Sequence, residues 1–217
     1  MTSFQKTTKR IFDLFFSILG LLTLWPLGIL IAIFVKLSSK GPVFYKQERI
    51  GRFGKPFLCV KFRTMFTGAD KLGTITAASD SRITLLGQFL RKYKLDELPQ
   101  VWNVFIGKMS FVGPRPDVSG YADRLENEDA RILDLQPGIT GPASIYFRYE
   151  EEILASVKNA KKFNDEVIWP KKVALNLRYL NEWQLWKDFC YIIITIVPAI
   201  NRLLKLLPES PKSPEQI

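Results

Sequence analysis

A run of 22 residues without a charged side chain, from Leu14 to Val35, constrains this chain more than any other feature. Folded as a helix, the run would extend about 33 Å, which matches the thickness of the hydrocarbon core of a bilayer. It is too long for the apolar part of a cleaved leader, and no small-x-small cleavage site precedes the next polar stretch. We therefore predict a membrane-embedded helix within residues 1–40.

Basic residues flank this run on both sides and Pro26 interrupts its middle. The flanking cations are Lys6, Lys9 and Arg10 before the run and Lys36 and Lys40 after it. Basic residues favour the cytoplasmic face, so both ends favour the same side of the membrane. Proline removes a backbone hydrogen bond and kinks a helix. A re-entrant helix broken at Pro26, with Asp13 near the headgroups, reconciles these facts, and a straight spanning helix with a tolerated proline is the alternative.

The composition narrows the chemistry that the chain can perform. Its net charge of +10 predicts an anionic partner, such as a phosphorylated molecule or the anionic inner leaflet of a membrane. The cations are scattered and no recognition motif accompanies them, so we expect no nucleic-acid partner. The chain has no histidine, which removes the commonest general base and metal ligand. Cys59 and Cys190 lack metal-site spacing and are interpreted as packing residues.

Short β-type runs follow the membrane segment. Val43–Tyr45 and Phe57–Phe62 are separated by a turn-rich stretch, which predicts a β-hairpin. Strict alternation along the second run places Lys61 and Arg63 on one face, so the two cations should point the same way. Solvent exposure and phosphate binding explain that face equally well.

Helical periodicity dominates the rest of the chain. Residues 83–93 and 98–105 have the spacing of amphipathic helices, residues 137–142 are typical of a loop, and residues 150–162 are charged and helical in character. The aromatic and aliphatic segment 183–207 suits either a helix lying in the membrane interface or a core helix.

These elements predict an α+β fold that is mainly helical. Residues 1–40 form the re-entrant membrane helix. Residues 41–207 form a small cytoplasmic catalytic domain with a short β-hairpin and interfacial amphipathic helices. Residues 208–217, rich in proline, serine and glutamate, form a disordered tail.

Two adjacent carboxylates and one rigid arginine are the best candidates for chemistry. Asp96 is a suitable N-cap for the helix predicted at 98–105, and the same helix start favours an ionised carboxylate and attracts phosphate. Arg115 lies between Pro114 and Pro116, which holds its backbone extended. A guanidinium on such a stiff support suits a phosphate group. With Glu97 beside Asp96, the pattern indicates phosphate chemistry.

Four motifs follow the apolar run in register and cover most of residues 6–142. They are Lys61–Met65, Leu95–Gln100, Met109–Pro116 and Pro137–Gly141. Together they resemble the small monotopic phosphoglycosyl transferases, a family of bacterial sugar transferases. The resemblance implies an enzyme at the cytoplasmic face of the bacterial inner membrane. Such an enzyme transfers a sugar 1-phosphate from a UDP-sugar to a polyprenol phosphate, with undecaprenyl phosphate as the acceptor that the resemblance implies, and releases UMP.

The resemblance also assigns roles to individual residues. Asp96 would be the nucleophile that takes the phosphosugar covalently, and Glu97 would assist at the metal or as a base toward the lipid phosphate. Magnesium (Mg²⁺) would be bound by these two carboxylates and the diphosphate. The candidates for phosphate binding are Lys61, Arg63, Arg91, Arg115 and Arg148.

The chain departs from the family's pattern after Gly141. Many relatives continue with a Leu-Ala-Gln type of sequence, whereas this chain continues with Pro142 and Ala143, so the sugar and the role of residues 142–180 stay open. At the membrane break, Trp25-Pro26 replaces the Ser-Pro of some relatives. The alternative function is a membrane-anchored basic scaffold that binds nucleotide or anionic lipid without turnover, which leaves Asp96 and Glu97 unexplained. Whether the chain forms a homodimer is also open.

Overall fold

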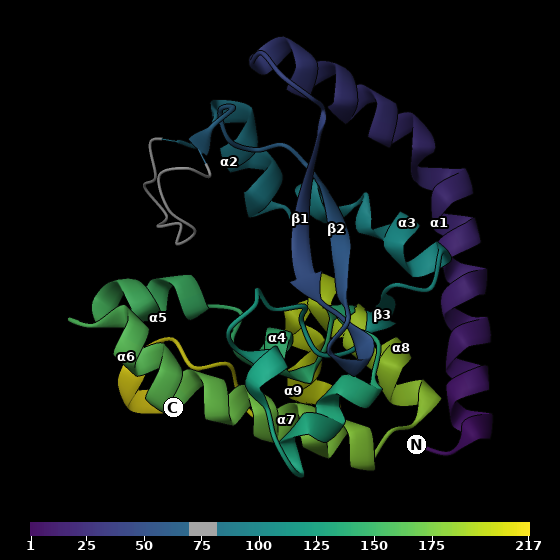
Figure 1. The fold of residues 1–217 in the computed structure, drawn as a ribbon, viewed down its shortest axis with the longest axis vertical. Coiled ribbons are helices and arrows are strands. Elements are labelled where there is room, and N and C mark those ends of the chain that lie inside the picture. Colours follow the sequence, from purple (N-terminus) through teal and green to yellow (C-terminus); the bar gives the residue numbers. More distant parts are fainter. Residues whose placement is uncertain (70–81) are drawn as a thin grey trace.

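The computed structural model describes residues 1–69 and 82–217. A long N-terminal helix runs along one side, a β-hairpin stands beside it, and shorter helices gather near the N-terminal end of the long helix (Figure 1). The predicted α+β class with mainly helical content is confirmed.

The first helix, α1, extends from Ser3 to Ser38 and contains Pro26. Figure 1 shows that α1 changes direction partway along its length, as a proline inside a helix predicts. Most of its apolar side chains are exposed, with Leu22 and Trp25 at 68% and 61%. Within the described residues, α1 is the one helix long and apolar enough to cross a membrane.

The N-terminal third of α1 is fixed to the rest of the chain by buried polar groups. The Asp13 carboxylate accepts hydrogen bonds from the Ser110 hydroxyl and the Phe111 backbone N–H, each at 3.0 Å. One turn earlier, Lys9 Nζ lies 2.6 Å from the carboxylate of the buried Asp188. Asp13 is therefore held inside the protein through its Oδ1, and its position relative to the headgroups stays a prediction.

The predicted hairpin is confirmed. Strands β1 (Phe44–Ile50) and β2 (Pro56–Phe62) pair antiparallel, with Phe44 opposite Phe62 and Ile50 opposite Pro56. The short 3-10 helix η1 (Arg52–Gly54) lies between them. Phe62 packs in a buried cluster with Ile31, Val35 and Leu90, which attaches the hairpin to α1 and to the helix α2 (Leu85–Lys92).

A second two-stranded sheet replaces the predicted loop at 137–142. Strand β4 (Gly138–Thr140) pairs parallel with β3 (Ser110–Val112). The loop prediction is wrong because glycines permit an unusually close backbone approach. A Cβ at Gly113 would clash with the Gln136 carbonyl oxygen, and a Cβ at Gly138 would clash with the backbone of Gly113.

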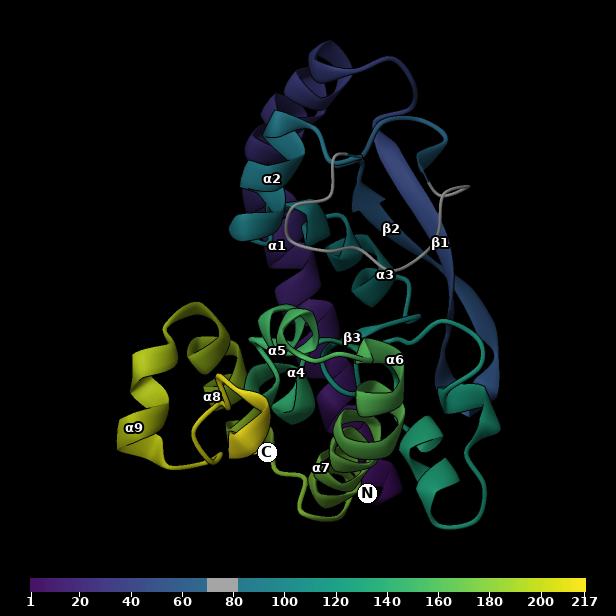
Figure 2. The ribbon, with the colours of Figure 1, turned by 90° about the vertical axis from the view of Figure 1, so that its left-hand side faces the viewer.

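Of the remaining helices, α3 lies between β2 and α1, and the others form the base of the molecule below the hairpin (Figures 1 and 2). Their bounds are α3 Gln100–Phe105, α4 Pro142–Tyr146, α5 Glu150–Ser156, α6 Ala160–Phe163, α7 Trp169–Asn181, α8 Leu185–Ile196 and α9 Asn201–Leu204. The helices predicted at 83–93, 98–105 and 150–162 are confirmed as α2, α3 and the pair α5 and α6. The last of these ranges contains a break between its two helices.

Helix α8 combines the two roles left open for segment 183–207. Tyr191 and Ile194 are buried in a core cluster with Trp183, whereas Phe189 and Ile196 are 50% and 74% exposed. One face of the helix is therefore core, and the other offers an apolar surface that suits a membrane interface.

Residues 208–217 lie against the body of the chain. The Ser210 hydroxyl donates a hydrogen bond of 2.9 Å to the Ile145 carbonyl, and Ile217 packs beside the cluster that contains Ile153 and Ile168. This arrangement differs from the disordered tail that the composition predicts.

Candidate active site

A tight turn between α2 and α3 presents the two candidate carboxylates. Lys94 adopts a left-handed conformation with φ of 56°, and residues Leu95–Glu97 form the 3-10 helix η3. Helix α3 then begins at Gln100, directly after Pro99. The prediction that Asp96 caps this helix is wrong, because η3 separates it from the first turn of α3 and Asp96 makes no capping hydrogen bond within the described residues.

Glu97 is held by two cations from distant parts of the chain. Its Oε1 accepts hydrogen bonds from Lys61 Nζ, on β2, and from Arg115 Nη2, on the loop after β3, each at 2.8 Å. Burial alone would raise the pKa of Glu97, but Arg115 and Lys61 outweigh it and hold the pKa well below its usual range. Glu97 is therefore ionised at neutral pH and orients both cations.

Asp96 is the unusual carboxylate of the site. It is 8% exposed, and its buried Oδ1 has no hydrogen-bond partner among the described residues. Burial and the adjacent Glu97 charge raise its pKa, while Lys61, Lys94 and Arg91 oppose that rise. A buried acceptor without a partner costs stability, and a catalytic role or a bound ion is one explanation for retaining it. Such an oxygen is available to attack an electrophile or to bind a metal ion.

Three of the five cations predicted to bind phosphate lie around these carboxylates. Lys61 and Arg115 contact Glu97 directly, and the Arg115 side chain is still 45% exposed. Arg91, on α2, donates from Nε to the Thr64 hydroxyl at 2.9 Å and lies near enough to Asp96 to lower its pKa. This cluster offers positive charge on several sides of Asp96.

The structure places the other two predicted cations differently. Arg63 lies just beyond the end of β2, and its guanidinium donates to the carbonyls of Val35 and Ser39 at 3.3 and 2.7 Å. The prediction that Lys61 and Arg63 point the same way is wrong, because Arg63 turns to the last carbonyls of α1. Arg148 is exposed and lies over the Tyr149 ring, 5.8 Å from its centroid, with no contact to Asp96 or Glu97 in the described part of the chain.

The carboxylates partly fit a magnesium ion. Mg²⁺ usually binds to one or two carboxylates and completes its shell with substrate phosphates and water. The free Oδ1 of Asp96 meets that requirement. Glu97 Oε1 fits less well because two cations already compensate its charge. Asp96 Oδ1 would therefore be the protein ligand of a bound magnesium ion, and no group of three or more acidic or cysteine side chains within the described residues forms a metal site by itself.

Sequence reasoning missed Arg49, which contacts the residue that follows Arg115. Arg49 donates to the Pro116 carbonyl at 3.1 Å and to the Gln47 side chain at 2.6 and 3.1 Å. The hairpin register contains the signal that could have found it. Gln47 pairs with Cys59 and Arg49 with Phe57, so both lie on the face of the sheet that carries Lys61.

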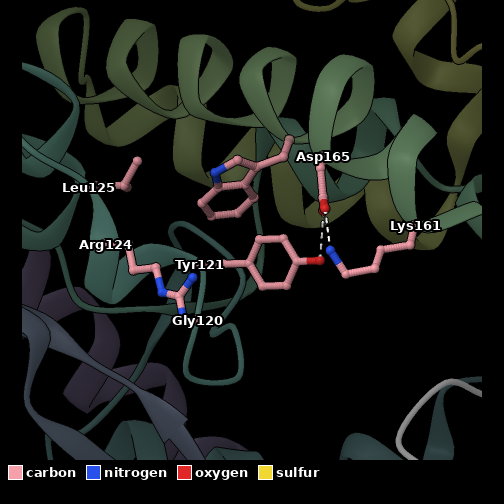
Figure 3. A pocket seen from close by; sticks show the side chains of 7 residues that line it. Gly120, Tyr121, Arg124, Leu125, Lys161 and Asp165 are labelled. Carbon is pink, nitrogen blue, oxygen red and sulfur yellow. Dashed lines mark hydrogen bonds and ion pairs between the residues drawn. The ribbon is translucent and has the colours of Figure 1, made fainter.

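A separate pocket of about 410 Å³ lies between the loop that follows Arg115 and the helices α6 and α7 (Figure 3). Tyr121 and Trp169 form part of its wall, with ring centroids 5.3 Å apart. Asp165 accepts hydrogen bonds from the Tyr121 hydroxyl at 2.9 Å and from Lys161 at 2.7 Å. These polar groups satisfy one another, and none of the residues predicted to be functional lines this pocket.

Comparisons with known proteins identify the class. A profile of the bacterial sugar transferase family matches residues 4–202, so the chain belongs to that family. A UDP-glucose:undecaprenyl-phosphate glucose-1-phosphate transferase of Xanthomonas campestris is 38% identical over 200 residues, which cover 89% of this chain and 39% of the relative. A transferase of the same name from Escherichia coli is 37% identical over 206 residues, covering 90% and 41%.

A third relative matches over most of its own length. The exopolysaccharide production protein ExoY of Sinorhizobium fredii is 34% identical over 209 residues, which cover 89% of this chain and 85% of the relative. The chain thus spans about two fifths of the two UDP-glucose transferases. Residues 61–141, which contain the site motifs, lie inside the matched family region.

Proposed function

We propose that this protein transfers a sugar 1-phosphate from a UDP-sugar to a polyprenol phosphate through a covalent intermediate on Asp96. The observation that carries this proposal is the buried, unpartnered Oδ1 of Asp96. The neighbouring Glu97 is ionised, and its charge is already compensated by Lys61 and Arg115. Relatives named for glucose 1-phosphate transfer to undecaprenyl phosphate support the two substrates.

In the first step, an ionised oxygen of Asp96 attacks the β-phosphorus of the UDP-sugar. A new O–P bond forms, the bond from that phosphorus to the bridging oxygen breaks, and UMP leaves with the electron pair. The product is an acyl phosphate that carries the sugar. Lys61, Arg91 and Arg115 offset the repulsion between carboxylate and diphosphate and stabilise the charge that develops on UMP.

In the second step, an oxygen of the polyprenol phosphate attacks the phosphorus of the acyl phosphate. The bond to Asp96 breaks, the carboxylate is regenerated, and a polyprenyl diphosphate sugar is released. Two anionic substrates thereby use one site in turn, which avoids holding both together against their mutual repulsion.

A magnesium ion would be held by Asp96 Oδ1 and substrate phosphate oxygens, and it would supply positive charge that polarises the phosphoryl group. Glu97 keeps Lys61 and Arg115 in place around that position, which is its main contribution in this proposal.

We place the site at the cytoplasmic face of the bacterial inner membrane, with α1 re-entering that face through its bend at Pro26. The exposed apolar surfaces of α1 and α8 support contact with lipid. Asp13 and Lys9 fix the N-terminal third of α1 to the rest of the chain. The distance between the bilayer surface and the site should therefore stay constant.

Release of UMP tests this proposal directly. The protein in detergent micelles or nanodiscs is incubated with UDP-glucose, suggested by the named relatives, and then with other UDP-sugars, each with and without undecaprenyl phosphate. We expect turnover only when lipid phosphate is present. Binding of UDP-sugar or anionic lipid without UMP release would support the scaffold instead.

A further inference from the structure

We propose that Arg49 is a positioning residue for the reaction, and that it acts by fixing the backbone of the turn that presents Arg115. This inference rests on the proposed function, in which Arg115 meets the substrate phosphates. Arg49 itself is not expected to touch the substrate.

The turn around Arg115 is held from both sides by hydrogen bonds. On the preceding side, the Gly113 N–H donates to the Thr140 carbonyl at 2.9 Å, and the Gly138 N–H donates to the Pro114 carbonyl at 2.7 Å. Both bonds continue the pairing of the small parallel sheet formed by β3 and β4. The residues before Arg115 are therefore fixed without any help from the hairpin.

On the following side, the hairpin strand β1 holds the next two residues. The Ile50 N–H donates to the Asp117 carbonyl at 2.8 Å, and Arg49 Nη1 donates to the Pro116 carbonyl at 3.1 Å. Arg115 thus lies between two anchored segments, and Arg49 supplies one of the two bonds on the hairpin side. Loss of that bond leaves Pro116 without its side-chain anchor, although the backbone bond to Asp117 remains.

Each of the three nitrogens of the Arg49 guanidinium already donates one hydrogen bond within the protein, which favours a positioning role over direct phosphate binding. Nε and Nη2 donate to Gln47 Oε1 at 3.1 and 2.6 Å, and Nη1 donates to Pro116. The planar fork of a guanidinium satisfies this geometry, whereas the single ammonium of a lysine cannot reach both acceptors in the same way. The important property of Arg49 is therefore the shape of its fork and not only its charge.

The experiment measures kcat and KM for the UDP-sugar in four single variants of the full chain, and in Arg115→Gln with and without Arg49→Gln. We expect Arg49→Gln to lower kcat/KM about tenfold, chiefly through kcat, because one hydrogen bond from a charged donor contributes on the order of 1.5 kcal/mol. Arg49→Lys should be equally impaired, and Gln47→Leu should show part of the same loss. Lys46→Gln removes a cation from the exposed, opposite side of the same strand and should match the wild type.

Two results would overturn the proposal. Rescue of activity by Arg49→Lys, together with a normal Gln47→Leu variant, would show that Arg49 acts by charge alone. An Arg49→Gln loss that persists in full in the Arg115→Gln background would show that it does not act through Arg115. The positioning role predicts that the double variant is no worse than Arg115→Gln.

A second readout remains valid if the protein has no transferase activity. Hydrogen exchange of backbone amides in residues 113–118 should be faster in Arg49→Gln than in Lys46→Gln. Faster exchange with no turnover in the wild type would reject the proposed function and keep the positioning role. Unchanged exchange in Arg49→Gln would reject the positioning role, and Gln47→Leu provides the same test if Arg49→Gln fails to fold.

Discussion

Two buried carboxylates in this protein have opposite surroundings. Asp188, which is fully buried, accepts hydrogen bonds from the Tyr179 hydroxyl at 2.7 Å, from Trp183 Nε1 at 3.1 Å and from Lys9 at 2.6 Å. Asp96 is almost as buried, yet its Oδ1 has no hydrogen-bond partner among the described residues. Asp188 thus has a complete set of partners, and Asp96 does not.

The difference separates a structural role from a chemical one. Lys9 lies on α1 and Asp188 on α8, so their ion pair joins the long apolar helix to the base of the molecule. The Tyr179 hydroxyl oxygen, whose single proton points to Asp188 in the shorter contact, also lies 3.2 Å from the Val112 carbonyl oxygen, at the end of β3 and three residues before Arg115. One carboxylate therefore joins parts of the scaffold, whereas the other costs stability and, in the proposed mechanism, supplies the reactive oxygen.

Asp96→Asn should have the largest effect on turnover. We expect UMP release to fall by about four orders of magnitude or more, because an amide cannot form the acyl phosphate and loss of a nucleophile has effects of that size. Stability should move the other way, since the raised pKa of Asp96 means that its ionised form is disfavoured in the folded state at neutral pH. The melting temperature should rise by about 2–4 °C for each kcal/mol relieved.

The control for that variant is Asp188→Asn, an identical change at the other carboxylate. If Asp96→Asn lost stability while Asp188→Asn did not, the contrast drawn between the two sites would be reversed.

Breaking the Lys9–Asp188 pair should have the second largest effect. Replacing either partner alone leaves a buried charge without compensation, which typically costs about 3–5 kcal/mol of unfolding free energy. The double variant Lys9→Met with Asp188→Leu should recover part of that loss, because neither charge is then left buried. Denaturant unfolding in micelles measures both effects, and additive losses in the double variant would argue against a coupled pair.

Arg115→Gln should lower kcat/KM for the UDP-sugar by about 10- to 100-fold, which corresponds to the loss of a charged hydrogen bond worth about 1.5–3 kcal/mol. It should destabilise the protein less than the Lys9 variants, because the Arg115 side chain is 45% exposed and Lys61 still compensates the Glu97 charge. A steady-state assay alongside a melting curve checks both statements. A large loss of stability with normal kcat/KM would place Arg115 among the structural residues.

The pH dependence should show the smallest effect. Activity requires ionised Asp96, so it should be lost as the pH falls through a pKa that burial and Glu97 raise above the ordinary 3.8. Glu97→Gln removes the Glu97 charge, which is one of the two causes that raise the pKa of Asp96. This variant should be less active, and its activity should be lost at a lower pH than in the wild type. The profile of kcat/KM against pH measures the shift, and a limb that moves to higher pH contradicts this assignment.

The sequence alone predicted the elements that local patterns specify. The charge-free run gave α1, alternation gave the hairpin, and helical spacing gave α2 and α3. It failed where distant segments meet. Strand β4 depends on contact between glycines far apart in the chain, and the role of Arg63 depends on its position beside the end of α1.

The candidate site shows the same division. Motif order identified Asp96, Glu97 and Arg115, but the pairing of Glu97 with both Lys61 and Arg115 is a tertiary contact that no spacing encodes. Asp96 appeared from the sequence to be a helix cap, because the 3-10 turn that removes it from α3 depends on the left-handed backbone of Lys94.

Detection of a covalent adduct on Asp96 tests the central claim most directly. The protein is mixed with a UDP-sugar and Mg²⁺ in the absence of polyprenol phosphate, and intact mass spectrometry with peptide mapping follows. We predict one sugar phosphate on the peptide that contains Asp96, absent from Asp96→Asn and removed when undecaprenyl phosphate is added. Release of UMP with no adduct, or an adduct on another residue, would contradict the proposed role of Asp96.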